Sequence, residues 1–408
     1  MAATMTTEMA MNTTATPQNF TIMTLTPVRF MPPVPLYILI VTAISCVLSL
    51  FGSFAIFWTF FKFQTLRTTS RKLLLYLTIA DFFTAAGYLM GVIRYWVDYT
   101  SGSGAKEDQC PKADAVCVAQ SYITTCSSLC SFFWMIVISA YFIIAVVKQD
   151  VEAANRMMVP SHVICWGLPV FLTSLALGFG VLGEDLSYTS GGWCWITACD
   201  LSNDVKLLWM LATGKFWEFV TYMVLIVNYL LLKYFIWKRM RYHSSLRRQG
   251  ISVPRSGEQL SGNDTMFIFV PIILLVLRIW GSLKFLITIS LSPSQGGDHE
   301  FESNKGIEVL TLFQGIGDSG QAFWNFVLFC LMTPEVRVAI LASFRQQFSW
   351  LRVDSITSDT STASEESVNS QTRRLVPSIT EEVREEYNRE RTALYHKQFS
   401  NYDSTSLG

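Results

Sequence analysis

Residues 36–61 read LYILIVTAISCVLSLFGSFAIFWTFF and contain no charged side chain. About 20 mostly apolar residues form a helix that crosses about 30 Å of hydrocarbon, so this stretch predicts a transmembrane span. A helix also satisfies its own backbone polar groups in lipid. Six similar stretches follow it, at residues 73–93, 116–147, 158–182, 207–232, 266–291 and 308–332. The sequence therefore predicts an all-α membrane protein built as a seven-transmembrane helix bundle.

The composition supports this interpretation and excludes another class of protein. Charged residues make up 15% of the 408 residues and apolar residues 51%, whereas soluble domains contain about 25% charged residues. The net charge of zero excludes a strongly basic nucleic-acid-binding protein, which needs an excess of cations to neutralise phosphates. We expect the lipid bilayer to surround the chain and no nucleic acid to bind it.

Basic residues in the loops predict the orientation. With the N-terminus outside, the inner loops hold thirteen Lys or Arg residues, and the N-terminal tail and outer loops hold six. The positive-inside rule favours this choice. Asn12 and Asn19 begin glycosylation sequons in the N-terminal tail, and such sequons are modified only on the lumenal side. The sequon at Asn263 falls in an inner loop and should stay unmodified.

Four of the nine cysteines lie on or beside outer loops, namely Cys110, Cys117, Cys194 and Cys199. An even set in an oxidising compartment predicts disulfides, and four cysteines allow three pairings. The nested pairing, Cys117 with Cys194 and Cys110 with Cys199, would tie the top of the third span to the loop after the fourth. The alternative is that only the first bridge forms.

Short motifs in most of the spans carry a resemblance to a known family. They are SRKLLLYLTIAD at 70–81, SFFW at 131–134, WGLP at 166–169, GWCWI at 192–196, TGKFWE at 213–218 and GIG at 315–317. Together with seven spans and an outside N-terminus, they resemble an orphan branch of the G-protein-coupled receptors near the cyclic-AMP and secretin-type receptors. The resemblance covers roughly residues 36–340 and neither tail.

The resemblance implies a receptor that transduces an unidentified extracellular ligand to a heterotrimeric G protein. For such a receptor we favour the Gq/phosphoinositide–calcium branch and the plasma membrane or ciliary membrane, and we expect no cofactor. The third span lacks an Asp/Glu-Arg-Tyr triplet and the seventh lacks Asn-Pro-x-x-Tyr, so rhodopsin-class switches do not transfer. The N-terminal tail contains no cysteine, so the bundle and outer loops must recognise the ligand.

Six ionisable residues fall inside the spans, where each is costly unless paired or hydrated and is therefore a functional candidate. The three acids and three bases allow complete neutralisation. Lys215 and Glu218 share a helix face and could pair, and Arg278 and Asp318 lie at matching mid-depth. The alternative is a polar network that only fixes helix register. The six residues are Asp81, Lys215, Glu218, Arg278, Lys284 and Asp318.

A ligand pocket is expected towards the outer face. Lys284 is the best placed base to contact a ligand, although its side chain could instead snorkel to the interface. Trp193, Trp195 and Trp280 could form the roof or floor of the pocket, although Trp is also common at membrane interfaces. The resemblance implies that Asp81 is a water- or sodium-linked position that responds to activation.

The inner face is basic. Residues 233–257 contain seven bases and no acid, which suits either a G-protein helix in a groove or anionic lipid. The candidate G-protein contacts are Arg71, Lys72, Lys238, Arg239 and Arg241.

Four regions follow from these patterns. Residues 1–35 form an extracellular tail and residues 36–332 the receptor bundle. Apolar residues at four-residue spacing predict an amphipathic helix on the membrane surface at 333–349. Residues 350–408 form a cytoplasmic tail that is mostly disordered. Its Ser/Thr-rich stretch at 355–367 could recruit arrestin when phosphorylated, or could be a plain solvated tail.

Other functions are less compatible with the sequence. A seven-span transporter usually shows repeat symmetry, which is not visible, and a constitutively active scaffold without ligand is the other alternative. A retinal pump needs a Schiff-base lysine, and residues 308–332 contain no lysine. Neither a hydrolase triad nor a metal-binding motif is apparent, so an enzyme is not expected.

Overall fold

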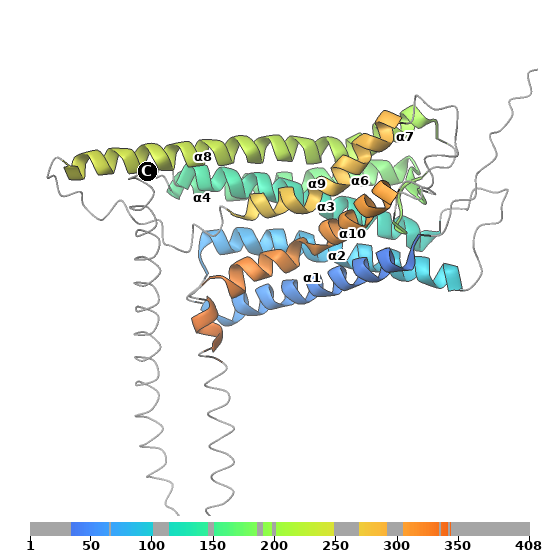
Figure 1. Cartoon of the computed structure of the whole chain (residues 1–408), viewed down its shortest axis with the longest axis horizontal. Helices are drawn as coiled ribbons and strands as arrows, with labels where there is room; N and C mark the ends of the chain where they lie inside the picture. Colours follow the sequence, from blue (N-terminus) through green and yellow to red (C-terminus); the bar gives the residue numbers. More distant parts are fainter. Residues whose placement is uncertain are drawn as a thin grey trace, which may run out of the picture.

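The computed structural model describes residues 34–64, 67–100, 114–145, 151–185, 191–197, 201–248, 269–291, 305–333, 336–341 and 343. Figure 1 shows long helices lying side by side along one axis. In this described part, six helices are long and apolar enough to cross a membrane. A seventh helix, α10 (Lys305–Phe326), packs along two of them (Figure 1). The predicted helical bundle is confirmed in these residues.

The first three spans are single helices, whereas the fourth, fifth and seventh contain π-helical turns. The first three are α1 (Leu36–Lys62), α2 (Thr69–Thr100) and α3 (Ala115–Ile143). The fourth consists of α4 (Val151–Arg156), α5 (Met158–His162), η3 (Val163–Gly167) and α6 (Leu168–Gly178). The fifth consists of α7 (Asn203–Met210), η5 (Leu211–Lys215) and α8 (Phe216–Arg248). The sixth is α9 (Phe269–Leu291), and the seventh is α10 followed by η8 (Val327–Leu331).

Helix α10 differs from the other spans in its polarity. Its buried face carries Gln321 and Asn325 beside Asp318, and it packs between α1 and α9. Polar side chains inside a membrane normally face the bundle interior rather than lipid. This arrangement explains why α10 belongs to the bundle although it is not among the six described helices that are long and apolar enough to cross a membrane.

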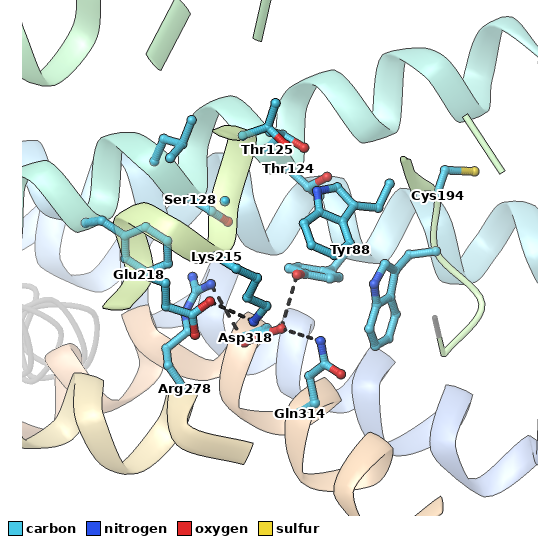
Figure 2. Close-up of a pocket in the computed structure, with 16 residues that line it drawn as sticks. Tyr88, Thr124, Thr125, Ser128, Cys194, Lys215, Glu218, Arg278, Gln314 and Asp318 are labelled. Atoms are coloured by element: carbon cyan, nitrogen blue, oxygen red, sulfur yellow. Dashed lines mark hydrogen bonds and ion pairs between the residues drawn. The ribbon is translucent and has the colours of Figure 1, made fainter. Parts of the chain in front are cut away.

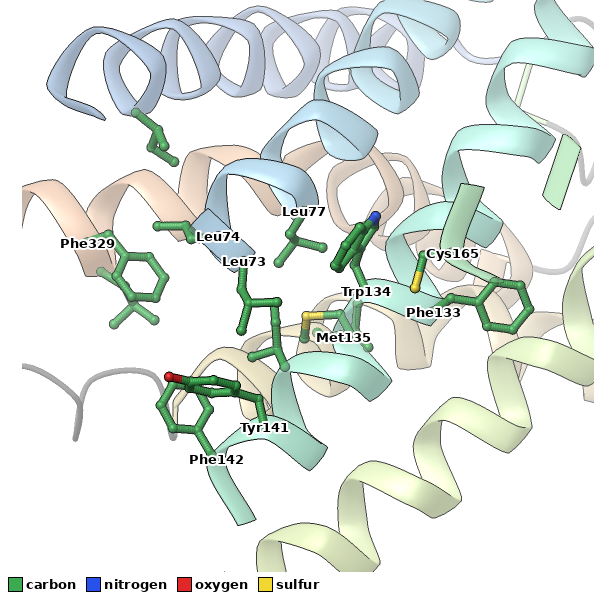
Figure 3. Packing of buried hydrophobic residues seen from close by; sticks show 14 of the residues in the cluster. Leu73, Leu74, Leu77, Phe133, Trp134, Met135, Tyr141, Phe142, Cys165 and Phe329 are labelled. Carbon is green, nitrogen blue, oxygen red and sulfur yellow. The ribbon is translucent and has the colours of Figure 1, made fainter. Parts of the chain in front are cut away.

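The apolar core fills the half of the bundle opposite the loop between α6 and α7. Leu73 and Leu77 of α2 pack against Trp134 and Met135 of α3 (Figure 3). The Trp134 ring also lies 5.8 Å from the Trp166 ring of η3. These contacts join α2, α3 and the fourth span into one block.

Two short strands follow the fourth span. They are β1 (Leu182–Gly183) and β2 (Trp195–Ile196), which pair antiparallel with Leu182 opposite Ile196. They lie at the end of the bundle that also carries α7 (Figure 1). Helix α8 extends past its neighbours at the other end (Figure 1).

Several predictions lie outside the described residues. These are the sequons at Asn12, Asn19 and Asn263, the Cys110–Cys199 pair, and the tails at 1–33 and 344–408. In the predicted surface helix, residues 336–341 are helical, and Val336 is fully buried and packs with Ile340 against the core. Whether the rest of 333–349 lies on the membrane stays a prediction.

Candidate functional site

The loop that contains β1 and β2 is fastened across one end of the bundle. Cys194 forms a disulfide with Cys117 of α3, which confirms the first predicted bridge. The Cys194 backbone N–H donates to the Gln120 side chain at 2.7 Å, and the Ser121 hydroxyl donates to the Trp195 carbonyl at 2.6 Å. One disulfide and two hydrogen bonds therefore fix this loop on α3.

Arg94 near the end of α2 also holds this loop, residues 182–196, which we call the roof of the bundle. Its guanidinium contacts Glu184 at 2.7 Å and Asp114 at 3.2 Å, and it donates to the Cys194 sulfur at 3.2 Å. One cation thus joins α2, the start of α3 and the residue after β1. From the sequence, Arg94 was counted only among the six bases of the N-terminal tail and outer loops. The acids in the same predicted loops were a usable signal that it forms ion pairs.

A cavity of about 70 Å³ lies beneath the roof. Trp193 and Trp195 line it from the loop, and Lys215 lines it from η5. Gly214 allows η5 to approach the Trp195 ring, because a Cβ on residue 214 would lie only 3.2 Å from that ring. The π turn η5 therefore presents Lys215 to the cavity, and such turns often occur at functional sites. The other charged lining residues are Glu218, Arg278 and Asp318 (Figure 2).

Glu218 is the most completely bonded charge in the cavity. It accepts from Lys215 at 2.7 Å, from Tyr222 at 2.6 Å and from Ser282 of α9 at 2.7 Å. The predicted Lys215–Glu218 contact is therefore present in the structure and extends to the neighbouring helix. Because each donor satisfies part of a buried carboxylate, this cluster can hold α8 against α9.

Arg278 and Asp318 are close but loosely paired. The Arg278 Nη1 lies 3.7 Å from the Asp318 Oδ1, and both side chains are nearly buried. The other Asp318 oxygen accepts from Tyr88 at 3.3 Å and from Gln314 at 3.1 Å (Figure 2). The Phe132 ring lies 4.9 Å below the guanidinium. This group connects α2, α3, α9 and α10 at the cavity floor.

A second polar group continues from the cavity along α10. Asp81 of α2 accepts from Ser131 at 2.8 Å and from Asn325 at 3.1 Å, and Gln321 donates to Ser131 at 3.1 Å. Asp318, Gln321 and Asn325 recur every three or four residues and so share one helix face. Only the charged residues of this network were predicted from the sequence, and the amides of Gln321 and Asn325 were missed, although their spacing with Asp318 is visible in it.

Two predicted pocket residues do not line this cavity. Lys284 is buried and lies 3.5 Å from the Thr311 hydroxyl, and Trp280 stacks on the Phe313 ring at 4.8 Å. Neither belongs to the lining residues. The structure instead places Arg278, from the same helix, in the cavity.

The predicted inner basic residues have different surroundings. Lys72 and Lys238 are exposed, and the Arg241 guanidinium lies 4.2 Å over the Trp237 ring. Arg71 is half-buried near the start of α2. The Arg239 side chain lies outside the described atoms.

Comparison with known proteins gives consistent matches. The family described as 7 transmembrane receptor (Secretin family) matches residues 36–274. G-protein coupled receptor 157 of Mus musculus is 32% identical over 305 residues, covering 74% of this chain and 84% of the relative. The Homo sapiens protein of that name is 31% identical over 306 residues, covering 74% and 82%. Cyclic AMP receptor-like protein A of Dictyostelium discoideum is 25% identical over 202 residues, covering 50% and 46%.

Proposed function

Because the chain belongs to the secretin family of seven-transmembrane receptors, we propose that it senses an extracellular ligand and activates a heterotrimeric G protein. The ligand would enter the cavity under the outer loop. The G protein would bind at the opposite end of the bundle. This family is a receptor family, and we propose no enzymatic activity.

The polar path from the cavity along α10 is the observation that supports this proposal. Asp318 lines the cavity, and Gln321 and Asn325 continue from it to Ser131 and Asp81. Ionisable groups inside a membrane are expensive and are a functional hypothesis by default. A ligand that changes the partners of Asp318 would bind two arrangements of this path unequally, and such a difference shifts the population of states.

The opposite end of the bundle suits a G protein. Helix α8 projects beyond its neighbours there (Figure 1), and Lys238 and Arg241 lie on its exposed extension. The groove between such helices would receive a G-protein helix, although the same bases would also attract anionic lipid. We propose coupling to the Gq/phosphoinositide–calcium branch, and arrestin as a partner of the Ser/Thr-rich stretch at 355–367.

Recruitment of each Gα class in cells tests this function. The full chain would be expressed with sensors for each class, with and without tissue extract, and its surface level measured in parallel. We expect the Gq-class sensor to respond at the plasma membrane or the cilium. Surface expression without recruitment of any class, in either condition, would contradict the proposal.

Matched variants separate the G-protein surface from a general effect of charge. Lys238→Gln combined with Arg241→Gln should reduce recruitment at equal surface level. Arg156→Gln removes a base whose side chain is 71% exposed at the end of α4 and should change recruitment less. Equal losses would indicate lipid attraction rather than a defined surface. If G-protein recruitment changes neither with tissue extract nor with substitutions of the residues that line the cavity, the ligand-independent scaffold would be favoured.

A further inference from the structure

We infer that the cavity binds a small zwitterion, with Arg278 holding its carboxylate and Asp318 its ammonium group. This inference rests on the proposed function, because it specifies the class of ligand at the same site. It starts from the buried charges whose bonding is incomplete within the described residues.

Arg278 is the most incompletely bonded of these groups. Its residue is 3% exposed, and its Nε and Nη2 have no hydrogen-bond partner among the described residues. Its third nitrogen, Nη1, lies 3.7 Å from Asp318, which is longer than a hydrogen bond. A guanidinium carries five N–H donors in a planar fork that matches a carboxylate. Nε and Nη2 are closed to solvent in this structure, so a carboxylate in the cavity would supply the acceptors that this buried cation lacks once the guanidinium turns towards it.

Asp318 is the matching acid. Its Oδ2 accepts from Tyr88 and Gln314, whereas the closest charged group to its Oδ1 is Arg278 at 3.7 Å. Glu218, in contrast, already has three donors within 2.7 Å, and one of them is Lys215. The incomplete pair therefore consists of one cation and one anion.

The net charge of the lining explains why both ligand charges are needed. Two bases and two acids line the cavity, so it is neutral overall. A simple anion would leave one uncompensated negative charge beside Asp318 and Glu218, and a simple cation would leave a positive charge beside Arg278 and Lys215. An uncompensated charge in a low-dielectric site is costly. A zwitterion keeps the site neutral while satisfying Arg278 and Asp318.

The size of the cavity limits the ligand. Its volume of about 70 Å³ is far below the roughly 300–1,000 Å³ of sites for drug-sized molecules. Thr124, Thr125 and Ser128 face it from α3, opposite Arg278 and Asp318 (Figure 2). The Thr125 hydroxyl also has no partner among the described residues. A small amino acid, with polar groups close together, fits this space and these walls.

Thermal stability of the purified full chain in lipid nanodiscs tests the ligand class without a G protein. The probes are glycine, β-alanine and γ-aminobutyrate, with acetate and methylamine as singly charged controls. A ligand that binds only the folded state raises the melting temperature. We expect a saturable increase with at least one zwitterion and none with either control. An equal increase with acetate or methylamine, or no increase with any zwitterion, would overturn the inference.

Variants on α9 locate the site. Arg278→Lys keeps the charge without the fork and should weaken binding at least tenfold, and Arg278→Gln should abolish it. Lys284→Gln, the matched loss of a buried base outside the cavity, should bind as the wild type does. Equal loss in Lys284→Gln would overturn the assignment. If Arg278→Gln does not fold, the probe series and Arg278→Lys still decide.

The two proposals can fail separately. G-protein recruitment in cells without stabilisation by any zwitterion would overturn only the ligand class. Stabilisation by a zwitterion in a chain that recruits no G protein would overturn only the proposed function.

Discussion

Arg278 and Asp318 should be energetically coupled, and a double-mutant cycle would measure this coupling. Replacing either residue alone with Ala leaves the other charge buried. Replacing both residues removes both charges, so no uncompensated charge remains buried. We therefore expect the double variant to be damaged less than the sum of the two single variants.

The geometry of the pair sets the magnitude. The side chains are 4% and 6% exposed, and the closest N–O distance is 3.7 Å. At an effective dielectric constant of about 20, Coulomb's law gives about 4.5 kcal/mol at this separation. Removing one partner of a buried pair costs about 3–5 kcal/mol. Because Asp318 keeps Tyr88 and Gln314 as donors, we expect a measured coupling of about 1–3 kcal/mol.

The assay uses the melting temperature of the purified chain and, independently, surface level and basal G-protein recruitment. The set comprises Arg278→Ala, Asp318→Ala and the double variant. Arg278→Ala combined with Lys206→Ala is the control, because Lys206 contacts Asp185 in the loop after β1 and shares no partner with Arg278. The control should be additive. Additivity of the Arg278–Asp318 cycle within about 0.5 kcal/mol would refute the pairing.

Three further predictions concern the roof, the orientation and the helix contacts. Cys117→Ser should strongly reduce surface expression, because a native disulfide contributes about 2–5 kcal/mol to the stability of small domains. Cys110→Ser should reduce surface expression less. Equal losses would contradict the nested pairing. Deglycosylation should shift the electrophoretic mobility of the wild type but not of a chain lacking both N-terminal sequons; a persisting shift would invert the orientation. Gly317→Ala should lower the melting temperature and basal recruitment, because the new Cβ would overlap the Leu277 carbonyl. Gly178→Ala is its control, because a Cβ there meets nothing within 4 Å and Gly→Ala at a compatible helical site reduces the entropy of the unfolded chain. It should not lower the melting temperature, and a decrease equal to that of Gly317→Ala would contradict the contact with Leu277 as the cause.

The sequence predicted the spans better than their internal geometry. The expected first span, 36–61, ends one residue before α1 does, and the expected third span, 116–147, begins one residue after α3. Hydropathy reports how many apolar residues follow one another, which is the length of a span. It does not report a π turn, so η5 and its presentation of Lys215 to the cavity were not foreseen.

The rotation of each helix limited the prediction of the site. In α9, Arg278 and Lys284 are six residues apart and so lie on different faces of the helix, and only the packing decides which of the two faces meets the cavity. Depth in the membrane therefore favoured Lys284 as the ligand contact, whereas the structure places Arg278 in the cavity lining. The Lys215–Glu218 pair was accessible because partners three residues apart on one helix must share a face. Pairs between helices, such as Asp81 with Asn325, depend on packing that no local spacing specifies.

Glycines on α10 connect the packing of the bundle with its polar path. A Cβ on Gly317 would overlap the Leu277 carbonyl of α9, and one on Gly315 would overlap the Thr42 side chain of α1. Small residues permit such close approach of helices in membranes. Gly317 precedes Asp318, and Leu277 precedes Arg278, so this close approach of α9 and α10 lies beside the ion pair. A ligand that inserts between Arg278 and Asp318 would therefore act beside this close approach of the two helices. We expect such a ligand to shift α9 and α10 relative to each other, and this shift would affect the opposite end of the bundle.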